Sequence, residues 1–179
     1  MSLLRAKLEA QASPSRVVVL ASTAHRMGGL DFADLHYRRG RAYGALSAYG
    51  QSKTANILFA KELAAQLAST GVTAVSLHPG VIATNLARHI GLSSITSALF
   101  KALVVDKTIP QGAATTLYAC LEPSLAEPAA RGSYLSDCAV TTPMTPQAQD
   151  ADGAVRKALW EATEAQLRDA LGEAGKTTA

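Results

Sequence analysis

The sequence predicts a layered α/β fold, in which a short parallel sheet of about three strands carries helices on both faces. Two observations support this prediction. Short apolar runs alternate with longer helical stretches, a pattern typical of parallel strands joined by right-handed helical crossovers. The run at residues 17–20 is continuously apolar, which indicates a strand buried on both faces, as in a parallel sheet.

The three strands are expected at residues 16–21, 72–77 and 132–136. A helix at 3–12 precedes the first strand, and a Ser-Pro-Ser segment ends that helix. Residues 23–46 hold several glycines, so a loop is expected there.

A long helix is expected at residues 47–69, capped at its start by Ser47 and ended by Gly71. This stretch is apolar on two sides, and such a helix is usually covered on both. The sheet should cover one side, and a second helix or a second subunit the other. Further helices are expected at residues 93–105, 110–121 and 151–171, the second of them with Pro110 in its first turn.

Tyr49 and Lys53 are the most informative pair of residues in the chain. Residues four apart on a helix lie on the same face, so the two side chains should lie close together. An ammonium beside a phenol favours the phenolate and eases proton release. Ser22, at the end of the first strand, adds a neutral donor for a carbonyl oxygen. The three residues therefore indicate a proton-transfer site for alcohol/carbonyl chemistry.

Composition excludes several other classes of function. The net charge of +3 is mild, and the arginines at 38, 39 and 41 are interpreted as a solvated loop, so no nucleic-acid partner is expected. The two cysteines form no CxxC pattern, which predicts no metal site and an intracellular, cytoplasmic location. No stretch is long and apolar enough to predict a transmembrane segment, although peripheral membrane association through residues 95–105 stays open.

Four segments of the chain resemble the short-chain dehydrogenase/reductase family, and within it the branch of retinol dehydrogenases and WW-domain oxidoreductases. They are residues 16–25 (RVVVLASTAH), 48–60 (AYGQSKTANILFA), 71–84 (GVTAVSLHPGVIAT) and 134–143 (YLSDCAVTTP). The resemblance covers only the second half of the family's domain. It implies a truncated Rossmann-like fold, with residues 1–172 as the C-terminal, catalytic half of one domain and 173–179 as a polar tail.

The resemblance implies a role for each matching residue. Ser22 would polarise the substrate carbonyl, Tyr49 would exchange the proton, and Lys53 would support the phenolate and bind the nicotinamide ribose. The turn at Pro79, Gly80, Val81 and Thr84 would hold the nicotinamide end of NAD or NADP. Residues 85–107 would form a lid over an apolar alcohol or carbonyl substrate.

One feature of the family is missing from the sequence. None of the thirteen glycines forms the G-x-G-x-x-G turn that holds the cofactor pyrophosphate, so the isolated chain is expected to bind NAD(P) weakly and to be inactive. Three hypotheses stay open. The chain is an NAD(P)-dependent oxidoreductase, an inactive fragment or pseudoenzyme, or an interaction module that pairs through helix 47–69 with an intact relative or a second copy.

Overall fold

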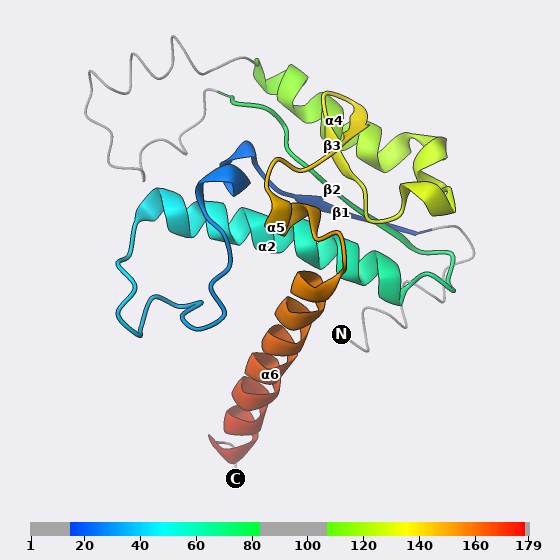
Figure 1. The fold of residues 1–179 in the computed structure, drawn as a ribbon. Coiled ribbons are helices and arrows are strands. Elements are labelled where there is room, and N and C mark those ends of the chain that lie inside the picture. Colours follow the sequence, from blue (N-terminus) through cyan, green and yellow to red (C-terminus); the bar gives the residue numbers. More distant parts are fainter. Residues whose placement is uncertain (1–14, 83–106, 178–179) are drawn as a thin grey trace, which may run out of the picture.

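The computed structural model describes residues 15–82 and 107–177, with side chains in the last helix described to residue 172. A four-stranded sheet in the order β1-β2-β3-β4 lies between α2 on one face and α4 on the other (Figure 1). The elements are β1 (Arg16–Leu20), η1 (Thr23–Met27), α2 (Ala45–Gln66), β2 (Thr73–Leu77), α4 (Ile109–Leu121), η3 (Pro123–Ala126), η4 (Pro128–Ala130), β3 (Tyr134–Ser136), β4 (Ala139–Thr141), α5 (Pro146–Gln149) and α6 (Ala154–Thr177).

The three predicted strands are present, and they pair in parallel. β1 pairs with β2 from Arg16 opposite Thr73 to Leu20 opposite Leu77, and β2 pairs with β3 at Leu77 opposite Leu135. All five residues of β2 are buried, as expected of a central strand covered on both faces. The predicted α/β fold is therefore confirmed.

A fourth strand, β4, was not predicted. It runs antiparallel to β3, and Ser136 pairs with Ala139 across a two-residue turn. Both turn residues, Asp137 and Cys138, adopt the left-handed conformation, with φ of 50° and 56°. Such turns normally contain Asn or Gly, so Asp-Cys carries no recognisable hairpin signal. β4 is also exposed along its length, and its sequence lacks the apolar run of a buried strand.

The helices differ from the prediction mainly at their ends. α2 begins at Ala45 after Gly44, so the prediction of Ser47 as its cap is wrong; the Ser47 hydroxyl donates instead to the Gly44 carbonyl at 2.9 Å. α4 has the expected Pro110 in its first turn and a capping box between Thr108 and Gln111. α6 continues to Thr177, and the expected helices at 3–12 and 93–105 lie outside the described residues.

Two apolar clusters hold the layers together. One lies between the sheet and α2, and the other between the sheet and α4. On the other side of α2, α6 crosses the helix (Figure 1), and the Phe59 and Trp160 rings stack with centroids 5.8 Å apart. The sequence predicted that a second helix or a second subunit would cover the second apolar side of α2. In the structure a second helix, α6, covers it. The clusters contain Leu63, Ala64, Leu67, Val72 and Ala74 on the α2 face, and Val75, Leu77, Ala119, Leu125 and Leu135 on the α4 face.

Candidate active site

The predicted site residues that the structure describes lie at one edge of the sheet. β1 and β2 end together, with Leu20 opposite Leu77, so the segments that follow them share the same edge. Ser22 follows β1, and the Pro79 turn follows β2. α2 reaches this edge with its first half, where the Lys53 ammonium donates to the Leu20 carbonyl at 3.3 Å.

Ser22 is held by the start of η1. Its backbone is extended, with φ of −162°, and its Oγ accepts a hydrogen bond from the Ala24 amide at 3.1 Å. Because a serine hydroxyl can donate one bond while it accepts others, the hydroxyl proton stays available to a ligand. The side chain is half-buried, so a ligand at the sheet edge has access to it.

Close packing of η1 on α2 sets the position of Ser22 relative to α2. A Cβ at Gly50 would lie 2.5 Å from the Ala24 carbonyl oxygen, so only glycine permits this approach. The buried Thr54 hydroxyl reaches back across the same contact, 2.8 Å from the Gly28 carbonyl and 3.2 Å from that of His25. η1 occupies part of the segment predicted as a loop, and these contacts explain why the chain is ordered there.

Tyr49 and Lys53 lie side by side on α2, as the four-residue spacing predicts. The Lys53 ammonium is 5.4 Å from the centroid of the Tyr49 ring, within the range of a cation–π contact. Both side chains are half-buried. The Tyr49 hydroxyl makes no hydrogen bond within the part of the chain that the structure describes, so it is open to an external partner.

The turn after β2 is built around Gly80. Its φ is +87°, a conformation that favours glycine, and its amide donates to Nδ1 of His78 at 3.0 Å. The Lys107 amide donates to the Val81 carbonyl at 3.3 Å, which fixes the turn next to the start of α4. Thr84 and residues 85–106 of the expected lid lie outside the described residues.

A buried aromatic group underlies the site. The Tyr134 ring lies edge-on to His25 and stacks on His78, with centroids 5.5 and 5.9 Å apart. His25 donates from Nδ1 to the Ser22 carbonyl at 2.7 Å, because its Nε2 accepts from the Met144 amide at 3.0 Å. Burial lowers the pKa of His25, and burial raises the pKa of the Tyr134 hydroxyl. Both groups stay neutral near pH 7 and support the segments that carry the site.

Comparison with known proteins agrees with this geometry. The profile of a family described as short chain dehydrogenase matches residues 40–93, which include Tyr49 and Lys53. The chain is 36% identical to human retinol dehydrogenase 14 over 87% of this chain, and 41% identical to human retinol dehydrogenase 12 over 83%. It is 42% identical to the chloroplastic short-chain dehydrogenase TIC 32 A of Brassica napus over 79%.

The chain belongs to the short-chain dehydrogenase/reductase family.

Within this family the chain is a partial match. It spans 45% of retinol dehydrogenase 14, 44% of retinol dehydrogenase 12 and 46% of TIC 32 A. The described residues form a Rossmann-type fragment with a mostly parallel sheet.

The family's usual cofactor is NAD(P). The sheet edge presents the Tyr49 hydroxyl and the Lys53 ammonium as polar groups. The Lys107 side chain occupies the space beside the Gly80 turn, since a Cβ at Gly80 would lie 2.5 Å from Cδ of Lys107. The sequence contains no G-x-G-x-x-G turn for the pyrophosphate.

One ordered feature escaped the sequence analysis. The Asp34 carboxylate accepts hydrogen bonds from the amides of Arg38, Arg39 and Arg41, at 2.6, 2.8 and 3.2 Å. Arg41 also donates to the Gln51 side chain on α2 at 2.6 Å. The arginine loop is thus fixed beside α2, and an Asp that precedes a glycine-containing turn is the signal that could have indicated it.

The described residues contain neither a metal-binding cluster nor a membrane-spanning helix. Within residues 15–82 and 107–172, no group of three His, Cys, Asp or Glu side chains could hold a metal ion. In the same part of the chain, no helix is long and apolar enough to cross a membrane.

Proposed function

We propose that this chain carries the proton-transfer part of an NAD(P)-dependent oxidoreductase that interconverts an alcohol and a carbonyl. The observation that carries the proposal is the placement of Ser22, Tyr49 and Lys53 at one sheet edge, with Ser22 held against α2 by the glycine contact.

The chemistry divides between cofactor and protein. When bound, NAD(P) exchanges a hydride with the substrate carbon. In reduction, the Tyr49 hydroxyl gives its proton to the substrate oxygen, while Ser22 donates a hydrogen bond to the same oxygen. In oxidation, the Tyr49 phenolate takes the proton from the alcohol. The Lys53 ammonium, 5.4 Å from the Tyr49 ring, stabilises the negative charge of the phenolate.

An apolar substrate is part of the proposal. Several relatives are named retinol dehydrogenases, and retinol is an apolar alcohol. The segment expected to form the lid, which lies outside the described residues, is rich in aliphatic side chains and contains Phe100. We place the protein inside the cell, where unpaired cysteines such as Cys120 and Cys138 persist.

The test compares the chain alone with the chain supplied with the glycine-rich segment of a relative, fused or added in trans. Calorimetry with NAD and NADP should detect weak or no binding to the chain alone, because no glycine turn holds the pyrophosphate. Hydride transfer to retinal should appear when the segment is supplied. Micromolar binding by the chain alone would contradict the first expectation, and inactivity of the supplemented chain would contradict the proposal.

A second candidate, an interaction module, is favoured by the position of β1. Within the described residues β1 is the end strand of the sheet, and Leu20 at its end is 48% exposed. An end strand offers unpaired backbone groups to another strand. A partner could also pair through the helix at residues 47–69, as the sequence predicts. Because α6 already crosses α2, such a partner, whether a relative or a second copy, would contact the part of α2 that α6 leaves open. Light scattering of the chain, alone and mixed with an intact relative, tests for such a complex.

A further inference from the structure

The side chain of Lys107 lies across the Gly80 turn, at the same sheet edge as the candidate active site. A Cβ on Gly80 would meet Cδ, Cε and Nζ of Lys107 at 2.5, 2.8 and 3.1 Å, so the outer half of the lysine follows the turn. The lysine side chain is only 15% exposed. A lysine is rarely buried to this extent unless its charge is paired.

Asp137 supplies the partner for this charge. The Lys107 ammonium donates to the Asp137 carboxylate, and the two form an ion pair. The same hydrogen bond holds the pKa of Asp137 below its ordinary value, so the carboxylate stays ionised at neutral pH. Asp137 is the first of the two turn residues between β3 and β4, and the ion pair therefore joins this hairpin to the Gly80 turn.

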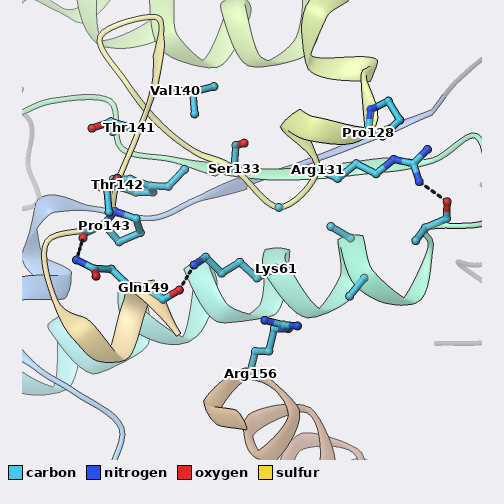
Figure 2. Close-up of a pocket in the computed structure, with 15 residues that line it drawn as sticks. Lys61, Pro128, Arg131, Ser133, Val140, Thr141, Thr142, Pro143, Gln149 and Arg156 are labelled. Atoms are coloured by element: carbon cyan, nitrogen blue, oxygen red, sulfur yellow. Dashed lines mark hydrogen bonds between the residues drawn. The ribbon is translucent and has the colours of Figure 1, made fainter. Parts of the chain in front are cut away.

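The hairpin that carries Asp137 is held at its turn. β4 is exposed along its length, and a cavity of about 610 Å³ lies between the segment that follows β3 and α2 (Figure 2). Figure 2 shows Val140 and Pro143 on one side of this cavity and Lys61 of α2 on another. Packing against α2 therefore does not fix the hairpin. The Cys138 amide donates instead to Oγ1 of Thr115 on α4, at 3.3 Å.

The backbone of Lys107 secures the end of the Gly80 turn. Lys107 forms a parallel bridge with Ile82, and its amide donates to the Val81 carbonyl at 3.3 Å. A Cβ on Gly112 would collide with the Ile82 side chain, so α4 packs closely on the same residue. These contacts fix residues 81 and 82. The Lys107 side chain extends the support to Gly80, whose amide donates within the turn to Nδ1 of His78.

We propose that Lys107 and Asp137 are positioning residues, and that their ion pair forms a strap that holds the Gly80 turn in its left-handed conformation. Glycine has the most flexible backbone, so the turn needs a contact from outside to keep one conformation. A turn that is already ordered binds a ligand without the cost of ordering it. The inference rests on the proposed function in one respect, that this turn receives the nicotinamide end of NAD(P).

The first test is amide hydrogen exchange of the full chain, followed by NMR at neutral pH. Asp137→Asn and Lys107→Met should each speed the exchange of the Gly80 amide about two- to fivefold. The amide of Val75, in the central strand β2, should keep its rate and serves as the internal reference. Asparagine tolerates the left-handed conformation, so Asp137→Asn removes the charge and keeps the hairpin.

Three further variants separate the strap from a general loss of stability. Lys107→Arg keeps the charge and should keep the slow exchange of the Gly80 amide. The double variant Lys107→Met/Asp137→Asn should exchange no faster than the faster single variant, because both substitutions remove the same pair. Arg168→Gln is the matched control: it breaks the exposed pair with Glu164 on α6 and should leave the Gly80 amide unchanged.

The second test uses the chain supplied with the glycine-rich segment of a relative. Lys107→Met and Asp137→Asn should raise the KM for NADH or NADPH about two- to fivefold. Their kcat should stay close to that of the wild type, because the strap belongs to other segments than Ser22, Tyr49 and Lys53. Lys107→Arg should restore the KM of the wild type.

Several outcomes would overturn the strap. They are an unchanged Gly80 amide in Asp137→Asn, and equal acceleration of the Gly80 and Val75 amides, which would show loss of the whole fold. A lower KM in Lys107→Met would also overturn it, because the lysine would then obstruct the turn. If the supplied chain is inactive, the proposed function fails, and the exchange of the Gly80 amide still decides whether the strap exists.

Discussion

A Cβ on Gly50 would lie 2.6 Å from the amide nitrogen of Gly28. The backbone of α2 at Gly50 therefore packs directly against the backbone at Gly28, in the segment that follows Ser22. Tyr49 is the neighbour of Gly50 on α2. The close approach of the two backbone segments therefore positions Ser22 relative to the turn of α2 that carries Tyr49.

Gly50→Ala should disrupt both the fold and the site. Alanine favours a helix over glycine, but the added carbon would overlap the backbone of Ala24 and Gly28. We expect the free energy of unfolding in urea to fall by about 1–3 kcal/mol. The control is Gly71→Ala, whose Cβ would meet no atom within 4 Å and which should change stability by less than about 0.5 kcal/mol. Equal effects of the two substitutions would contradict the role of the glycine contact.

Tyr49→Phe should abolish most of the turnover of the chain supplied with a glycine-rich cofactor segment. The substitution removes the proposed proton donor and keeps the ring, so we expect a loss of about 10²–10⁴-fold. Ser22→Ala should cost less, since it removes a hydrogen bond and leaves the proton donor. Tyr43→Phe is the control, because Tyr43 is 72% exposed and lies before α2. Near-full activity of Tyr49→Phe would refute the assignment of the site.

His25 should make the stability of the protein depend on pH. Burial lowers the pKa of His25 below its ordinary value of 6.5, so the unfolded state binds a proton that the folded state does not. The contribution of neutral His25 to the free energy of unfolding is therefore fully present above about pH 6.5. This contribution is lost as the pH drops from there toward the lowered pKa. Urea unfolding at about pH 5 and about pH 7.5 measures the difference. His25→Gln should reduce this difference, whereas His36→Gln should retain it; no change in His25→Gln would contradict the prediction.

Glu62→Gln should lower the free energy of unfolding more than a matched substitution on the surface. Glu62 is 9% exposed and accepts from Arg156 at 3.2 Å and from Gln66 at 3.0 Å, so its loss leaves a half-buried guanidinium with a weaker partner. We expect a loss of about 1.5–3 kcal/mol in the free energy of unfolding. Glu164→Gln breaks the exposed pair with Arg168 and should cost less than about 0.5 kcal/mol. Equal losses would show that burial adds nothing to the Glu62 pair.

Local sequence determined the parallel strands and the pairing of Tyr49 with Lys53. A continuously apolar run has few alternatives to a buried strand, and a four-residue spacing places two side chains on one helix face whatever the surroundings. Pro110 marked the start of α4 for a similar reason, because proline has no amide hydrogen to donate. These features depend on neighbours in the chain and so are readable from the sequence.

Tertiary structure decided the rest. Gly44 rather than Ser47 caps α2, because the cap depends on where the backbone turns into the helix. β4 exists because Asp137 and Cys138 adopt left-handed conformations that few sequence signals announce. The contact between Gly28 and Gly50, and the cavity shared by Lys61, Arg131 and Arg156, join residues far apart in the chain. Such contacts are set by how layers pack, and spacing along the sequence does not encode them.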